Sequence, residues 1–199
     1  LLDVRGLTHT FGARVACQAV TFSVYPGEVL AVVGESGSGK TTLLRCISGQ
    51  QRPQAGQVLF TSRTGEAMDI WAAAESSRRM LARTDWGFVH QNARDGLRLD
   101  VSAGANIGER LMAVGARHYG KLRGEADAWM RRVELDVTRI DDAPAAFSGG
   151  MQQRLQIARN LVTHPRLTFM DEPTGGLDVS VQARLLDLLR GLTADLGLA

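Results

Sequence analysis

The sequence predicts an α/β fold in which β-rich and α/β segments flank a mainly helical insert. Three observations predict it. Apolar and polar residues alternate with a period of two over much of the first 30 residues. Apolar runs of strand length then alternate with helical segments, and a mainly helical stretch at about 92–147 interrupts them. With 199 residues, 44% of them hydrophobic, the chain is long enough for such a core.

The N-terminal residues have strand character. Residues 2–4 and 20–24 alternate between apolar and polar side chains, as a half-buried strand does. Residues 29–33 are a continuous apolar run that ends at Gly34. Such a run is typical of a strand buried on both faces of a parallel sheet.

The remaining elements follow from the period of the apolar positions and from the residues that start or stop them. We expect strands at 57–62, 86–89 and 167–170, and helices from Lys40 to near Gly49 and at 76–82, 154–162 and 179–192. The helical stretch divides the chain into a core with its β part (1–91 and 148–199) and a helical subdomain (92–147) of one domain.

Charge and apolar patterning exclude several classes of function. The net charge is only +2, from 23 basic and 21 acidic residues, which gives no electrostatic basis for a direct nucleic-acid partner. No apolar run approaches the roughly 20 residues of a membrane span, and no secretion signal opens the chain. Cys17 and Cys46 form no CxxC pair and fit a reducing compartment. We therefore expect a cytoplasmic protein.

A phosphate-binding loop is the most specific motif. Residues 34–41 fit GxxxxGK[ST] between a predicted strand and a predicted helix, a context that argues against an accidental glycine-rich turn. Glycines let the backbone wrap an anion, and the N–H groups at the helix start point at phosphates. Lys40 would reach the β- and γ-phosphates of ATP, and the Thr41 hydroxyl would ligate Mg²⁺. The expected ATP-binding residues here are Gly34, Glu35, Ser36, Gly37, Ser38, Gly39, Lys40, Thr41 and Thr42.

Two acids end the strand predicted at 167–170. Ligands of α/β sheets bind beyond the carboxyl ends of strands, and neighbouring strand residues point to opposite sides. We therefore expect Asp171 to take part in Mg²⁺ coordination through water and Glu172 to act as the general base toward the attacking water. An acidic turn that caps the next element is the alternative.

A serine and two glycines precede the helix that contains residues 154–162. Ser148 is a good N-cap, and Gly149 and Gly150 expose backbone N–H groups at a positive helix end. This start is a candidate second anion site, with a purely structural cap as the alternative.

In their order along the chain, these motifs resemble those of the ATP-binding cassette (ABC) ATPases. The set comprises the phosphate loop, Gln91, a signature at 148–153, the acidic strand end and a D-loop at 175–178, so the resemblance covers essentially the whole chain. It implies a P-loop NTPase fold of ABC type, with an antiparallel β subdomain and an inserted helical subdomain. It also implies Mg²⁺-dependent ATP hydrolysis and a second cassette, identical or different, whose signature closes over the nucleotide.

The resemblance also assigns further residues. Gln91 would sense Mg²⁺ and the γ-phosphate, Phe11 would stack on adenine, Gln152 would belong to the nucleotide-binding signature, and Asp178 would contact the second cassette. A surface glutamine and a core aromatic are the alternatives for Gln91 and Phe11. The expected catalytic residues are then Glu172, Lys40 and Gln91, and the expected metal ligands are Thr41, Gln91 and Asp171.

Within the family, the stretches 95–98, 101–112 and 115–120 and the Gly-Gly form of the D-loop resemble the cassette of the bacterial carbon–phosphorus lyase pathway. This implies a subunit that docks on the phosphonate-cleaving core subunits and powers them. The chain has no iron–sulfur cysteine cluster, so the bond cleavage would lie in those partners. The alternatives are the ATPase of a phosphonate or peptide importer, with a membrane permease as partner, and a non-hydrolytic ATP-dependent clamp.

ABC cassettes continue after this last helix to a strand and a switch histidine that contacts the γ-phosphate. None of the four histidines occupies that position. The resemblance therefore implies that the C-terminal part with the switch histidine is absent from this sequence.

Overall fold

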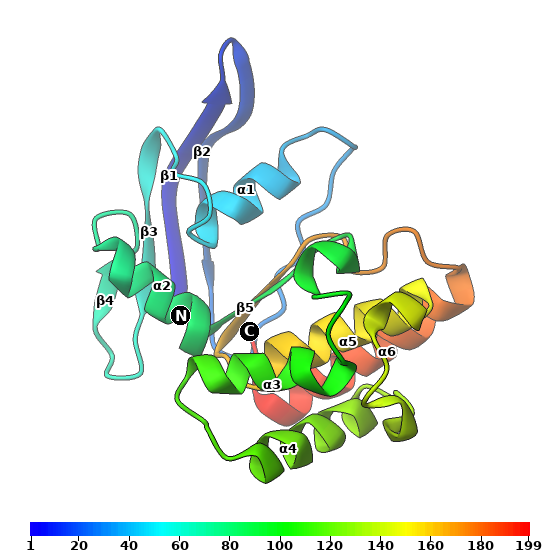
Figure 1. The fold of residues 1–199 in the computed structure, drawn as a ribbon. Helices are drawn as coiled ribbons and strands as arrows, with labels where there is room; N and C mark the ends of the chain where they lie inside the picture. Colours follow the sequence, from blue (N-terminus) through cyan, green and yellow to red (C-terminus); the bar gives the residue numbers. More distant parts are fainter. The chain divides into compact units, whose positions relative to one another are not determined.

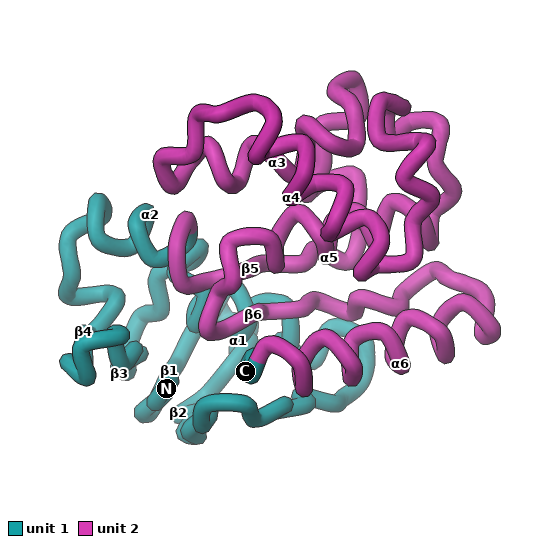
Figure 2. Tube along the Cα trace, turned by 90° about the horizontal axis from the view of Figure 1, so that it is seen from below, with its two compact units in different colours: residues 1–82, 197–199 teal, residues 83–196 magenta.

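A computed structural model describes all residues from 1 to 199. The chain forms two compact units (Figure 2). Unit 1 comprises Leu1–Ala82 with Gly197–Ala199, and unit 2 comprises Arg83–Leu196. None of the helices combines the length and the apolar character that a bilayer-spanning segment requires. The division into a core and a helical subdomain within one domain stays a prediction.

Unit 1 contains a four-stranded antiparallel sheet in the order β2-β1-β3-β4. Its strands are β1 (Leu2–Phe11), β2 (Arg14–Val24), β3 (Ala55–Thr61) and β4 (Ala67–Asp69). β1 and β2 form a long hairpin that closes with Phe11 opposite Arg14 (Figure 1). The strand character predicted for the first residues and for 57–62 is confirmed, whereas the three-residue β4 was not predicted.

The core of unit 1 lies along one face of β1. Leu2 and Val4 are at most 2% exposed, as the period of two predicts, and Leu7 is equally buried after an irregularity of the register between Val4 and Leu7. Helix α1 (Lys40–Ile47) contributes Leu43, Cys46 and Ile47 to the buried residues. Helix α2 (Glu75–Thr84) contains the boundary between the two units. The helix predicted from Lys40 is thus confirmed.

The strand predicted at 29–33 is wrong. Residues 28–35 belong to no strand, and the side chains of Val29 and Val33 are 74% and 89% exposed. An apolar run becomes a strand only where a neighbour supplies its backbone hydrogen bonds. The four strands of unit 1 pair with one another and none of them pairs with this segment.

Unit 2 contains a parallel pair of strands, β5 (Trp86–Val89) and β6 (Leu167–Met170). They pair in register from Trp86 opposite Leu167 to Val89 opposite Met170. The rings of Trp86 and Phe169 meet edge to face with centroids 5.5 Å apart. Both strands have the bounds that the sequence predicts, and their carboxyl ends lie side by side.

Helices make up most of the remaining part of unit 2 (Figure 1). They are α3 (Ala103–Ala113), α4 (Tyr119–Arg132), α5 (Gly149–Leu161) and α6 (Val179–Leu196), with short 3₁₀ turns η1 (Ala93–Gly96), η2 (Val137–Arg139) and η3 (Pro144–Ala146). α3 and α4 lie within the predicted insert, and both pack against α5. α5 starts earlier and α6 ends later than the periodicity predicts. The structure therefore has the mixed helix and sheet composition, with an antiparallel sheet, that the sequence predicts.

Candidate functional site

The predicted phosphate loop is an exposed turn that leads directly into α1. The N–H of Ser38 donates to the carbonyl of Glu35 at 3.2 Å. Gly39 precedes α1 in a left-handed conformation with φ 101°. A Cβ at this position would lie 2.0 Å from the carbonyl oxygen of Ala16, so only glycine fits there. The loop therefore owes its shape to its own backbone and to the close approach of Ala16 in β2.

The loop curls around the side chain of its own lysine. The Nζ of Lys40 donates to the carbonyls of Gly34 and Glu35, both at 2.9 Å. These carbonyls hold the ammonium inside the turn, where an incoming phosphate would meet a positive charge and the N–H groups at the helix start. Thr41 and Thr42 follow in the first turn of α1 and are half-buried.

Arg14 connects this loop to the β1–β2 hairpin. Its Nη2 donates to the carbonyl of Gly37 at 2.9 Å. In the β1–β2 ladder, Arg14 is the strand partner of Phe11. The Phe11 ring is 53% exposed and packs edge to face on His9, with ring centroids 4.8 Å apart. The hairpin tip thus lies beside the loop. Sequence reasoning missed Arg14, and no motif marks it because the contact joins residues distant in sequence.

A second group of predicted residues meets at the carboxyl ends of β5 and β6. The Nε2 of Gln91 donates to the Oε2 of Glu172 at 2.8 Å. The N–H of Gly175 donates to the carbonyl of Glu172 at 2.8 Å, and a Cβ at Gly175 would lie 3.5 Å from the Nε2 of Gln91. The amide and the carboxylate therefore face each other over a closely packed turn.

The two acids after β6 have different surroundings. Asp171 is only 9% exposed, and its N–H donates to the carbonyl of Val89 at 2.9 Å, which extends the pairing of the strands. Glu172 is exposed and has a left-handed backbone with φ 42°, which is uncommon for a residue with a side chain. The buried Asp171 and the exposed Glu172 thus have the different environments that a metal ligand and a general base would require.

The serine–glycine segment caps α5. The Oγ of Ser148 accepts from the N–H of Met151 at 3.3 Å. A Cβ at Gly150 would lie 2.9 Å from the Cγ1 of Val181 on α6, so the lack of a side chain lets α6 approach the start of α5. Gln152 is 5% exposed and donates to the carbonyls of Pro144 and Phe147, so it lies beneath the helix start.

The start of α6 carries the predicted D-loop residue. Asp178 is exposed, and its carbonyl accepts from the N–H groups of Val181 and Gln182, each at 2.9 Å. Its carboxylate is thus placed at a helix N-terminus on the surface of unit 2.

The predicted residues fall into two sets. Unit 1 contains the phosphate loop and Phe11, and unit 2 contains the other predicted residues, namely Gln91, Ser148, Gly149, Gly150, Gln152, Asp171, Glu172 and Asp178. Within unit 2, a hydrogen bond joins Gln91 and Glu172.

Residues 17–175 match the family model described as ABC transporter. The chain belongs to this ABC family of ATP-binding cassettes. The predicted family, the fold class and the assignment as an ABC-type ATPase are thereby confirmed.

Relatives of this ABC cassette include proteins of two kinds. It is 61% identical over 199 residues to the putative phosphonates utilization ATP-binding protein PhnK of Escherichia coli K12, covering 100% of this chain and 77% of that protein. It is 36% identical over 214 residues to a putative peptide import ATP-binding protein of Brucella ovis. That match covers 100% of this chain and 62% of the relative, so the chain spans less than two thirds of the peptide import protein.

Solved ABC cassettes have the same fold. One is a dimeric ATP-binding cassette in a post-hydrolysis state bound to ADP and Pi, with a TM-score of 0.86 at 27% identity over 99% of this chain and 84% of that one. Another is cbiO1 of Clostridium perfringens, part of an ABC transporter complex, with a TM-score of 0.82 at 26% identity over 99% of this chain and 75% of that one.

Proposed function

We propose that this cassette binds and hydrolyses ATP with Mg²⁺ and that it powers the carbon–phosphorus lyase complex in phosphonate breakdown. The hydrogen bond between Gln91 and Glu172 at the strand end is the observation that carries the hydrolytic role. The 61% identity to a protein named for phosphonate utilization, over the whole chain, supports the choice of system.

ATP binding rests on the phosphate loop. The turn before α1 keeps its left-handed conformation next to the Ala16 carbonyl because position 39 carries no side chain. Lys40 would exchange the carbonyls of Gly34 and Glu35 for the β- and γ-phosphates, which offer a charged partner for the same ammonium. The exposed Phe11 ring supplies a face on which adenine would stack.

The proposed metal ligands fit Mg²⁺ by their chemistry. Thr41, Gln91 and Asp171 supply hydroxyl, amide and carboxylate oxygens, the hard donors that Mg²⁺ prefers. When bound, Mg²⁺ would neutralise charge that develops on the transferred phosphoryl group. Within unit 2, the Nε2 of Gln91 donates to the carboxylate of Glu172, and its Oε1 is the atom that would bind the metal ion.

Glu172 would orient the attacking water and accept its proton. The hydrogen bond from Gln91 holds the carboxylate in one orientation at the end of β6. A base held in place before the reaction needs no reorganisation when the water attacks.

A second cassette would complete the site. Ser148, Gly149 and Gly150 at the start of α5, together with Asp178 at the start of α6, are proposed to face the nucleotide held by a partner cassette. The buried Gln152 would support this helix start from beneath. The solved relative that binds ADP and Pi is described as dimeric, which supports this arrangement. ATP-driven closure would then be a population shift that an attached complex can follow.

The substitution Glu172→Gln tests the hydrolytic role. It preserves the shape of the side chain but removes the proton acceptor. We expect phosphate release to fall at least about 100-fold while ATP binding persists, so that an ATP-bound dimer accumulates on size-exclusion chromatography. Glu125→Gln on the exposed surface of α4 is the matched control. Unchanged turnover in Glu172→Gln would refute the assignment.

Capture from a cell extract tests the choice of system. Recovery of subunits of the carbon–phosphorus lyase supports the proposal. Recovery of an integral permease would instead support an importer ATPase, the second candidate, which the 36% identity to a peptide import protein favours. ATP-dependent closure without steady-state phosphate release in the assembled complex would identify a non-hydrolytic clamp.

A further inference from the structure

Three amide side chains of α5 lie against β5 and the residues that follow it. They are Gln153, Gln156 and Asn160, all at most 7% exposed. Their spacing of three and four residues places them on one face of the helix. Asn160 accepts from the N–H of Phe88 at 3.2 Å. The other two reach His90, the residue directly before Gln91.

Gln156 binds both backbone polar groups of His90. Its Oε1 accepts from the His90 N–H at 2.6 Å, and its Nε2 donates to the His90 carbonyl at 3.1 Å. The same Nε2 donates to the Oε1 of Gln153 at 3.2 Å, while Gln153 also donates to the His90 carbonyl at 3.3 Å. Every hydrogen-bonding position of this fully buried amide, apart from its second lone pair, is therefore used.

The chain beyond Gln91 returns to the same amide. A Cβ at Gly96, in η1, would lie only 2.4 Å from the Oε1 of Gln156. The Gln156 amide therefore contacts the turn that follows β5 at its beginning, through the backbone of His90, and at its end, at Gly96. Only a residue without a side chain allows this approach.

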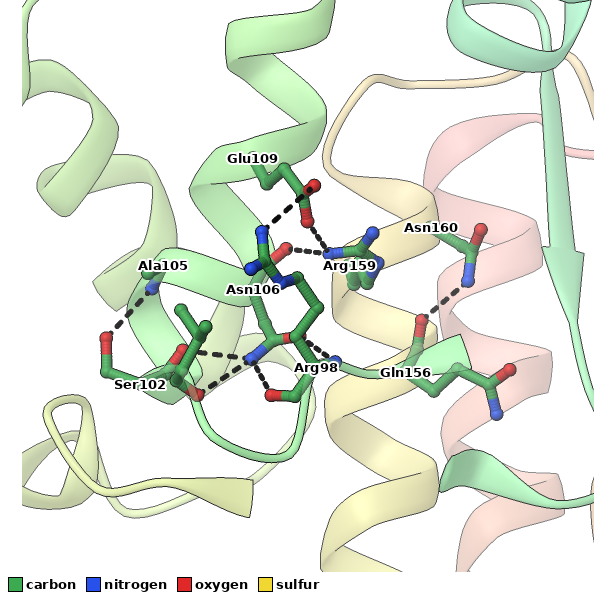
Figure 3. Close-up of polar contacts among 9 residues, drawn as sticks. Arg98, Ser102, Ala105, Asn106, Glu109, Gln156, Arg159 and Asn160 are labelled. Carbon is green, nitrogen blue, oxygen red and sulfur yellow. Dashed lines mark hydrogen bonds and ion pairs between the residues drawn. The ribbon is translucent and has the colours of Figure 1, made fainter. Parts of the chain in front are cut away.

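α5 also holds the next part of the segment, through Arg159 (Figure 3). The Nη1 of Arg159 donates to the carbonyl of Asn106 at 2.8 Å and to the Oε2 of Glu109 at 2.7 Å, both on α3. The buried Asn106 amide in turn donates to the carbonyls of Arg98, Val101 and Ser102 and accepts from the N–H of Arg98. One helix thus fixes the segment from His90 to Ser102 at both of its ends.

We propose that Gln156 is a positioning residue that holds Gln91 in place against Glu172. This inference rests on the proposed roles of Gln91 and Glu172 in hydrolysis. The carbonyl of His90 belongs to the peptide plane that joins His90 to Gln91. A donor fixed on that carbonyl therefore restrains this peptide plane and with it the Cα from which the Gln91 side chain starts. The start of α5 carries the signature segment, so the same helix joins Ser148 to the position of Gln91.

The substitution Gln156→Met separates positioning from folding. Met has nearly the volume and the flexible shape of Gln but neither donor nor acceptor. In the complete protein with its partner complex, we expect kcat to fall about 10- to 100-fold with an ATP affinity close to that of the natural protein. The Mg²⁺ concentration for half-maximal turnover should rise. Gln156→Glu keeps the acceptor for the His90 N–H but replaces the donor by a carboxylate oxygen that faces the His90 carbonyl, so it should not recover kcat.

Asn160→Leu is the matched control. It removes a buried amide from the same face of α5, but its partner Phe88 lies within the ladder to Phe169 of β6. We expect a loss of stability comparable to that of Gln156→Met and little change in kcat. The proposal would be overturned if kcat fell in proportion to the melting temperature, and by the same amount, in Gln156→Met and Asn160→Leu.

Hydrogen exchange and a double substitution distinguish the possible failures. Gln156→Met should speed amide exchange at residues 90–92, and in Gln91→Ala it should cause no further loss of kcat, because both changes remove one function. Additive losses in the double variant would overturn the positioning role. Gln91→Ala could leave kcat unchanged while Gln156→Met speeds exchange at 90–92. The proposed function of Gln91 would then fail, although Gln156 does hold the backbone of His90.

Discussion

The phosphate loop and the glutamine segment after β5 are held in different ways. The phosphate loop is shaped by its own backbone, through a left-handed glycine and two carbonyls that accept from Lys40. The segment after β5 is held by side chains of other elements: the buried Gln156 and the half-buried Arg159 of α5, which are distant in sequence, and the buried Asn106 of α3. A local design makes the loop recognisable from eight consecutive residues, whereas the glutamine segment depends on the packing of the whole unit. Substitutions in the phosphate loop should therefore weaken ATP binding, whereas those in the segment after β5 should affect stability or turnover and leave ATP binding unchanged.

The largest effect is expected at Gly39. In Gly39→Ala the new methyl group would collide with the Ala16 carbonyl, and the residue would have to keep a positive φ. We expect a loss of about 3 kcal/mol in the free energy of unfolding and no measurable ATP binding by calorimetry. Gly65→Ala is the control, because Gly65 also has a positive φ of 85° but nothing within 4 Å of the added Cβ. Equal behaviour of the two variants would show that the close approach to Ala16 is unimportant.

The next effect concerns ATP affinity alone. Lys40→Ala removes the ammonium from the turn, and we expect the Kd for ATP to rise about 100-fold, or about 2.7 kcal/mol, without a fall in melting temperature. Lys40→Arg should recover little of this affinity, because the planar guanidinium does not replace a compact ammonium between phosphates. Lys121→Ala on the exposed surface of α4 serves as control. An undiminished affinity in Lys40→Ala would contradict the role of this lysine.

In the segment after β5, Asn106→Ala should lower stability and leave the ATP affinity unchanged, the reverse of what we expect for Lys40→Ala. The amide makes four hydrogen bonds in a fully buried site, at 2.8 to 3.1 Å. We expect a loss of about 2 to 4 kcal/mol in the free energy of unfolding in urea, with an unchanged Kd for ATP. Ser102→Ala removes only the N-cap of α3 and should cost about 1 kcal/mol. A weakened ATP affinity in Asn106→Ala would remove the distinction between the two regions.

The smallest effect is expected at the surface of unit 2. Arg123 forms two hydrogen bonds with Asp141, at 2.6 and 2.7 Å, and this contact lowers the pKa of the Asp141 carboxyl below its ordinary value of 3.8. Since the folded pKa is depressed, the stabilisation is present above pH 3.8 and is lost as the pH falls through the folded pKa. In Arg123→Leu the pKa of Asp141 should return toward 3.8, measured by NMR titration of the carboxyl carbon. A titration unchanged by the substitution would contradict this cause.

Elements with a local pattern could be predicted from the sequence. β5 and β6 have the predicted bounds, and the phosphate loop leads into a helix at Lys40 as its motif requires. The strand predicted at 29–33 is wrong because an apolar run does not reveal which strand will pair with it. The short β4 was missed because Ala67–Asp69 gains its strand conformation from pairing with β3, without a strand-like sequence of its own.

Site residues divide in the same way. Gln91 and Glu172 could be proposed from their places after apolar strands and from family resemblance, and the structure joins them by a hydrogen bond. Arg14 and Gln156 could not be proposed, because their contacts with Gly37 and His90 are made across the fold. A glutamine in the middle of a helix gives no indication of the backbone that it binds.

The left-handed backbone at Glu172 has a consequence for the evolution of this chain. A residue with a side chain pays on the order of 1 kcal/mol for such a conformation, and glycine avoids that cost. Selection for heat tolerance alone would therefore favour the loss of the carboxylate at position 172. Only selection for turnover opposes it, so directed evolution toward stability should be coupled to an activity screen, or it will remove the acid on which hydrolysis is proposed to depend.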